Sequence, residues 1–171
     1  MPSGLSPGDA PPEKTMRLTQ WTDYALRVLM YCASHQQREH APTIAEIAEV
    51  HGISRSHLMK IVMELSAKGW LSTTRGRGGG LRLVQDPSQI VVGEVVRQME
   101  EDFTLVECFS TEGRSCAIDA NCRLKGVLAD ALQAWMRVLD GVTLAELVAT
   151  GTGVSTVPLT AVKRRKAGSD A

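Results

Sequence analysis

The sequence lacks any apolar run long enough to cross a membrane, for which a helix needs about 20 consecutive apolar residues. It also lacks the layout of a signal peptide, in which a basic segment precedes an apolar one. We therefore expect a soluble, cytoplasmic protein. With 171 residues, 43% of them hydrophobic and 22% charged, the chain is able to form one domain, or two very small ones, around a hydrophobic core.

The chain also lacks net charge, since 19 basic and 19 acidic residues balance, and this alone argues against a nucleic-acid partner. The charges are, however, segregated along the sequence. Residues 43–82 contain six Lys or Arg and three Glu, whereas residues 84–112 contain one Arg and seven acidic residues. A basic region followed by an acidic one is typical of a protein that presents one face to phosphates.

Signatures of enzymes are missing as well. There is no nucleophile elbow, phosphate-binding loop or carboxylate pair in a convincing context. The glycine-rich run at residues 75–80 has neither the glycine spacing nor the strand-to-helix setting of a nucleotide-binding fingerprint. All four histidines lie in the N-terminal third, and none is close in sequence to the clustered cysteines. We therefore expect that the protein is not an enzyme.

The apolar spacing that is present predicts a mainly α-helical protein with a winged helix-turn-helix at residues 16–88. A first helix over 19–34 is followed by a second that Thr43 caps, with Glu46 completing a capping box. Gly52 marks the turn. Ser54 caps a third helix, and residues 70–84 form a hairpin around the glycines.

The pattern of apolar residues in the second half of the chain predicts a homodimer. Residues 89–150 begin with a helix over 90–99 and contain a cysteine-rich loop and a long helix after Cys122. The apolar stripe of this long helix is wider than a small domain covers alone, so we expect it to pair with the same helix of a second subunit as a homodimer. A short helix at 144–149 follows. Residues 1–15 and 151–171 are expected to be a disordered extension and a disordered basic tail.

Basic and polar residues in the third helix and the hairpin form the candidate DNA-reading set. The first turn of a recognition helix carries the contacts to base edges and phosphates. We expect base reading by Arg55 or Ser56 and phosphate binding by Lys60, whereas an arginine of the hairpin enters the minor groove. The complete candidate set is Arg55, Ser56, His57, Lys60, Arg75 and Arg77.

Three of the four cysteines, Cys108, Cys116 and Cys122, are separated by seven and five residues. The chain lacks both the tight pairs of a zinc module and a C-x-x-C redox pair. In a reducing compartment such clusters are metal ligands or redox sensors, and the wide gaps suit an iron–sulfur cluster. This chemistry does not determine the identity of the fourth ligand. Cys32 is one candidate, but it lies on an apolar helix face, which favours a core residue.

Three segments together resemble a known family: MRLTQWTDYALRVL from Met16, RGRGGGLRL from Arg75, and CFSTEGRSCAIDANCRL from Cys108. From residue 16 to about residue 149, the chain is similar to the winged-helix iron–sulfur repressors, which include NsrR and IscR. The resemblance implies a DNA-binding transcriptional repressor, a palindromic operator and a homodimer. It also implies that Cys108, Cys116 and Cys122 bind the iron–sulfur cluster, with [4Fe–4S] favoured over [2Fe–2S].

The resemblance also suggests the fourth ligand. IscR-like members have a histidine three residues after the last cysteine, where this chain has Lys125. NsrR-like members use an Asp of the first helix from the other subunit, which corresponds to Asp23. Asp23 also lies four residues before Arg27, and from the residues alone an ordinary ion pair on the helix surface explains it.

The NsrR-like resemblance implies that nitric oxide attacks the cluster and releases DNA. Two alternatives remain open at this point. One is an IscR-like sensor of cluster supply or iron, and the other is a metal-free cysteine redox switch.

Overall fold

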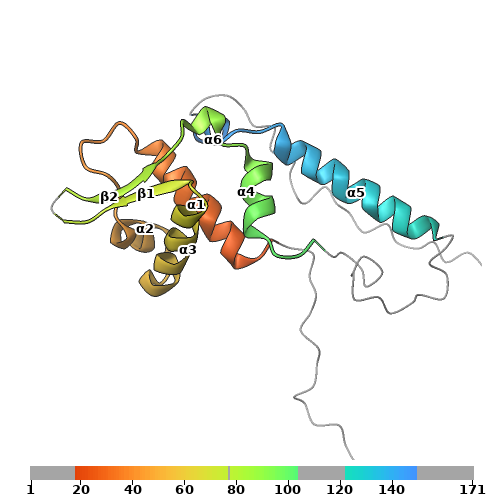
Figure 1. Cartoon of the computed structure of the whole chain (residues 1–171), viewed down its shortest axis with the longest axis horizontal. Helices are drawn as coiled ribbons and strands as arrows, with labels where there is room; N and C mark the ends of the chain where they lie inside the picture. The colour runs from red at the N-terminus through yellow and green to blue at the C-terminus, as the bar shows by residue number, and fades with distance from the viewer. Residues whose placement is uncertain (1–17, 77, 104–121, 150–171) are drawn as a thin grey trace, which may run out of the picture.

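The computed structural model describes residues 18–76, 78–103 and 122–149. Helices α1, α2 and α3 and the β1–β2 hairpin form one lobe, α4 lies beside α1, and α5 projects away from the lobe (Figure 1). This order confirms the predicted mainly helical, winged helix-turn-helix fold. The elements are α1 (Gln20–Ser34), α2 (Ile44–His51), α3 (Arg55–Ala67), β1 (Leu71–Thr74), β2 (Gly80–Leu83), a 3₁₀ turn η1 (Pro87–Gln89), α4 (Val92–Met99), α5 (Arg123–Asp140) and α6 (Leu144–Val148).

The helices of the lobe begin at side-chain caps. Thr19, Thr43 and Ser54 each accept a hydrogen bond from a backbone N–H group of the first turn that follows. Gly52 ends α2 with φ 65°, a left-handed conformation that glycine adopts without a steric penalty. The caps predicted at Thr43 and Ser54 and the turn between α2 and α3 are confirmed.

The capping box predicted at Thr43 forms only in part: the Thr43 hydroxyl accepts from the Glu46 N–H, but the predicted return hydrogen bond from Thr43 to the Glu46 carboxylate was wrong. The Glu46 carboxylate does not return to the cap but accepts hydrogen bonds from the Tyr31 hydroxyl (2.8 Å) and the Arg38 guanidinium (2.6 Å). Its pKa is lowered, chiefly by the hydrogen bond from Tyr31 and also by that from Arg38. A partner distant in sequence thus displaces the local one, because a hydrogen bond from a guanidinium is stronger than one from a neutral amide.

The helix expected over 90–99 begins later, at Val92. The preceding residues are extended because they pair with the segment before α6. The Ile90 carbonyl accepts from the Leu144 N–H at 2.8 Å, and the Val92 N–H donates to the Val142 carbonyl at 2.9 Å. The last helix ends at Val148, one residue before its predicted end.

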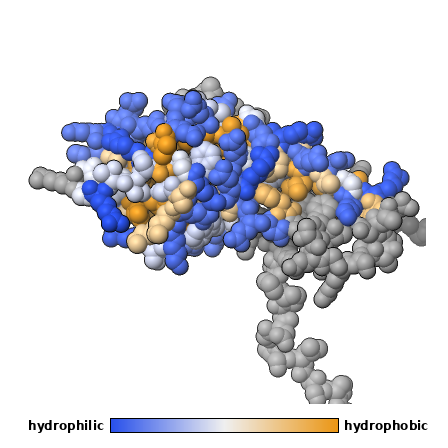
Figure 2. All heavy atoms as spheres, in the orientation of Figure 1, coloured by the Kyte–Doolittle hydropathy of each residue, from blue (hydrophilic) through white to orange (hydrophobic). Residues whose placement is uncertain are grey.

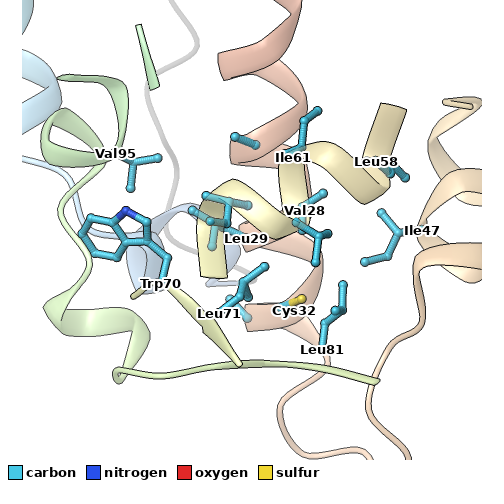
Figure 3. Packing of buried hydrophobic residues seen from close by; sticks show 14 of the residues in the cluster. Val28, Leu29, Cys32, Ile47, Leu58, Ile61, Trp70, Leu71, Leu81 and Val95 are labelled. Carbon is cyan, nitrogen blue, oxygen red and sulfur yellow. The ribbon is translucent and has the colours of Figure 1, made fainter. Parts of the chain in front are cut away.

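One hydrophobic core joins the three helices of the lobe to the hairpin (Figure 3). Its centre includes side chains with no exposed surface from each helix, and Cys32 is only 2% exposed among them. The interpretation of Cys32 as a core residue is thus confirmed. The central residues are Val28 and Leu29 of α1, Ile47 of α2, and Leu58, Ile61 and Leu65 of α3, with Leu71 and Leu81 from the hairpin.

The hairpin, which is the wing of this fold, is fixed to the loop before α2. Its strands are antiparallel, with Leu71 opposite Leu83 and Thr74 opposite Gly80. The Leu81 N–H donates to the Pro42 carbonyl at 2.8 Å. A Cβ atom at Gly80 would lie 2.6 Å from the Ala41 carbonyl oxygen, so only glycine allows this close approach. The wing is therefore held in a fixed position relative to α2 and α3.

Helix α5 is 18 residues long, and none of its residues is buried. Its C-terminal end is attached to α4 by a bidentate pair in which Arg97 donates to Asp140 at 2.5 and 2.6 Å. Apolar atoms lie exposed over α5 in Figure 2. One side of this helix is thus apolar and uncovered, and it is formed by Leu124 (63% exposed), Val127 (62%), Trp135 (39%) and Val138 (67%).

Candidate nucleic-acid interface and cluster site

The outward face of α3 carries polar and basic side chains. Arg55, Ser56 and Lys60 are exposed, whereas Leu58 and Ile61 on the opposite face are fully buried. Neither Arg55 nor Lys60 forms an ion pair with another residue in the part of the chain that the structure describes. The two cations are therefore available to an anionic partner.

His57 is positioned differently from the rest of the predicted DNA-reading set. It is half-buried, and its ring centroid lies 5.4 Å from that of Trp21 and 5.5 Å from that of Tyr24. The first turn of α3 is thus packed against two aromatic side chains of α1. This contact indicates that His57 holds the first turn of α3 against α1, with part of its side chain at the surface.

Trp21 also contacts the third turn of α3. Its indole Nε1–H donates to the Glu64 carboxylate at 2.6 Å, and Glu64 pairs with Lys68 at 3.4 Å. Trp21 and Glu64 were not among the predicted functional residues. No sequence signal pairs them, because they lie 43 positions apart. Together with His57, they connect the beginning of α1 to both ends of α3.

In the wing, Arg75 is exposed at the end of β1, and Arg77 lies outside the described residues. Gly76 and Gly78 have φ values of 96° and 80°. Non-glycine residues rarely adopt such backbone conformations, so these glycines allow the chain to turn between the strands. Arg75 is thus presented to solvent immediately after β1.

Asp23, the candidate cluster ligand of α1, forms an ion pair on the helix surface. Its carboxylate oxygens accept from the Arg27 Nε at 3.1 and 3.0 Å, and the Arg27 Nη2 lies 3.0 Å from Oδ2. The side chains of Asp23 and Arg27 are 44% and 47% exposed. An exposed pair at this spacing is worth about 0.3–0.5 kcal/mol, so Asp23 is able to exchange Arg27 for another partner at little cost.

The N-terminus of α1 is tied to the end of α4, just before the cysteine-rich segment. Both the backbone N–H and the hydroxyl of Thr19 donate to the Glu100 carboxylate, at 2.6 and 3.2 Å. The chain then passes into residues 104–121, which include Cys108 and Cys116 and lie outside the described residues. The turn that carries Asp23 is thus connected to the end of α4, at Glu100.

Cys122 is half-buried and precedes α5 as its N-cap residue, and its side chain makes no cap hydrogen bond. A helix N-terminus favours a negative charge, which suits a thiolate ligand. Within residues 18–76, 78–103 and 122–149, no group of three or more His, Cys, Asp or Glu side chains is placed to hold a metal ion. The complete predicted ligand set therefore depends on Cys108 and Cys116, which lie outside those ranges.

Cys32 is buried in the core, whereas Cys122 is half-buried. Burial, together with the negative charge of Glu46, raises the pKa of the Cys32 thiol to about 12. At pH 8 its thiolate fraction is therefore on the order of one in ten thousand, and the thiolate is the reactive form. In metal-free protein treated with iodoacetamide at pH 8, we expect Cys122 to be alkylated and Cys32 to stay unmodified, as measured by peptide mass spectrometry. Equal labelling of both in the folded protein would contradict this prediction, and unfolding in urea is the positive control.

In the described part of the chain, no helix is both long and apolar enough to span a membrane. Residues 18–150 match the family model Rrf2, described as an iron-dependent transcriptional regulator. The chain is 49% identical over 133 residues to the HTH-type transcriptional regulator NsrR of Bacillus subtilis strain 168, an alignment that covers 78% of this chain and 90% of that protein.

Solved structures share the fold. IscR of T. potens has a TM-score of 0.61 at 23% identity, covering 78% of this chain and 86% of that one. CymR, the global cysteine regulator of B. subtilis, has a TM-score of 0.62 at 25% identity, covering 81% and 100%. These comparisons confirm the resemblance and the prediction of a regulator rather than an enzyme. The chain therefore belongs to the Rrf2 family of iron-dependent transcriptional regulators.

Proposed function

We propose that this regulator is a homodimeric DNA-binding repressor whose operator binding depends on an iron–sulfur cluster, [4Fe–4S] in preference to [2Fe–2S], and is relieved by nitric oxide. The observation that carries the proposal is the 49% identity to NsrR over 133 residues, which is 78% of this chain. The family match over residues 18–150 includes the winged helix, the cysteine segment and α5. The exposed cations of α3, which form no ion pair among the described residues, and the solvent-accessible carboxylate of Asp23 agree with it.

DNA binding is assigned to α3 and the wing. Arg55 and Ser56 project from the first turn of α3, where a recognition helix meets base edges, and Lys60 is placed to bind phosphate. The exposed Arg75 extends the basic surface along the wing, and Arg77 completes it in the proposal. Two copies of α3 in a dimer would meet two half-sites of a palindromic operator about one helical turn apart.

Cluster binding is assigned to Cys108, Cys116 and Cys122 of one subunit and Asp23 of the other. The two candidates within the described residues suit this role, since one is a half-buried thiol at a helix N-terminus and the other an exposed carboxylate. When bound, the cluster supplies iron that reacts with nitric oxide. A carboxylate is a harder and more exchangeable ligand than a thiolate, so the Asp23 position would be the one open to attack.

The contacts between α1 and α3 supply the coupling between the two sites. Asp23 lies between Trp21 and Tyr24, the two residues that contact His57 at the beginning of α3. Trp21 also binds Glu64 in its third turn. A shift of Asp23 on release from its ligand position would therefore change the packing of the recognition helix, and DNA affinity would fall.

Two variants test the role of Asp23, because Asp23→Ala and Arg27→Ala remove the same surface ion pair. If Asp23 binds the cluster, only Asp23→Ala should change the visible absorption spectrum and shorten the lifetime of the cluster in anaerobically purified protein. In a nitric-oxide titration with operator binding followed in parallel, Arg27→Ala should respond like the wild type. Equal behaviour of the two variants would assign Asp23 to the ion pair alone.

The same titration separates the proposed function from its alternatives. Loss of the visible absorption band together with DNA release supports the nitric-oxide-sensing repressor. A cluster that persists in nitric oxide while DNA binding follows iron supply indicates an IscR-like sensor. A protein that stays colourless after treatment with iron and sulfide, and still binds DNA, indicates a metal-free cysteine switch.

A further inference from the structure

Two methionines stand exposed on α3. Met59 is 52% exposed and Met63 is 70% exposed, although α3 buries Leu58, Ile61 and Leu65 completely on its other side. Single exposed apolar side chains are common on protein surfaces. Here, however, two large apolar side chains occupy successive turns of the helix that carries the proposed DNA contacts.

The two methionines share a face with the basic and polar residues of α3. Met59 lies four positions after Arg55 and three after Ser56, and Met63 lies four positions after Met59. Residues three and four apart are neighbours on a helix surface. The exposed face therefore begins with a cation and a hydroxyl, continues with two thioethers, and has Lys60 alongside them.

This mixed face fits the major groove of DNA better than it fits water or an apolar protein surface. An apolar protein partner would have to bury Arg55 and Lys60, which have no ion-pair partners among the described residues. DNA offers phosphates to these cations. It also offers one apolar group in the major groove, the C5-methyl of thymine, which apolar side chains contact. The unbranched, polarizable methionine side chain adapts to such a contact.

We propose that Met59 and Met63 determine sequence specificity by contacting thymine methyl groups in the operator half-site. The inference rests on the proposed function, in which α3 enters the major groove. The first turn would then form hydrogen bonds through Arg55 and Ser56, and the following turns would select thymine at one or two positions. A half-site without thymine at these positions would bind less tightly, even with every phosphate contact kept.

The test starts from the full-length protein, purified anaerobically, and a library of DNA duplexes with a randomised central region. After selection of bound duplexes, each thymine of the selected site is replaced in turn by uracil, which lacks only the methyl group. For the wild type we expect affinity to fall about fourfold at one or two thymines of each half-site, the effect of one buried methyl group. Met59→Ala should make uracil and thymine equivalent at the thymine that Met59 contacts, and Met63→Ala should do so at the thymine that Met63 contacts.

Two control variants identify the cause. Met59→Leu keeps an apolar contact and should keep the sensitivity to uracil, which also shows that the helix is intact. Lys60→Ala should weaken binding to all duplexes while leaving the uracil effect unchanged. The inference is overturned if a selected duplex binds the wild type equally with uracil at every position. It is also overturned if the loss of affinity caused by uracil persists at every sensitive thymine in both Met→Ala variants.

These outcomes differ from a failure of the proposed function. If the library yields no enriched duplex that the protein binds, DNA binding itself fails and the role of the methionines fails with it. If a duplex is enriched and bound but no methyl group matters, the repressor proposal stands and only this inference is lost.

Discussion

Replacing Cys122 by serine should abolish cluster binding and, with it, tight binding to the operator. A serine hydroxyl is a poor substitute for a thiolate ligand of iron, and Cys122 also connects the cysteine segment directly to α5. We expect loss of the visible absorption band and of bound iron. Operator affinity should fall on the order of a hundredfold, since mutating even the residues that support metal ligands costs up to about a hundredfold in metal affinity or activity. Anaerobic spectroscopy, iron analysis and a DNA-binding titration measure these effects.

The matched control for this variant is Cys32→Ala. Cys32 is 2% exposed in the core, so its removal should lower stability slightly and leave cluster content unchanged. A Cys122→Ser protein that keeps its iron and its operator affinity would remove Cys122 from the ligand set. Loss of cluster in Cys32→Ala without unfolding would place the fourth ligand at Cys32 instead.

The second large effect is expected from the uncovered side of α5. Substituting glutamate for both Val127 and Val138 should separate the proposed dimer into monomers, because pairing would bury four unpaired carboxylates per dimer. The two valines are 62% and 67% exposed, so a single subunit should fold normally. A monomer engages one half-site only, and operator affinity should fall on the order of a hundredfold through loss of bivalent binding.

Sedimentation velocity and circular dichroism measure the oligomeric state and the fold of this variant. Gln133→Glu introduces the same side chain at an exposed position on the opposite side of α5 and should remain dimeric. A Val127→Glu/Val138→Glu protein that stays dimeric would show that α5 does not form the dimer contact.

The beginnings of the helices in the lobe could be predicted because their causes are local. Thr19, Thr43 and Ser54 precede apolar residues at helical spacing, and a cap needs only the N–H groups two or three positions ahead. The wing was equally predictable, since several glycines between two short apolar runs favour a hairpin. The one cap prediction that failed did so at Glu46, whose partners Tyr31 and Arg38 come from outside α2.

By itself, the sequence determined the order of elements, the burial of Cys32 and the chemical type of each candidate site. These properties follow from short-range spacing and from the side chains themselves. Only the tertiary structure decided which surfaces are available. It showed that Trp21 and Glu64 meet across 43 positions, that Thr19 binds Glu100, and that one side of α5 remains uncovered. Such contacts join segments whose distance in sequence carries no periodic signal, so their pairing is fixed only when the chain packs.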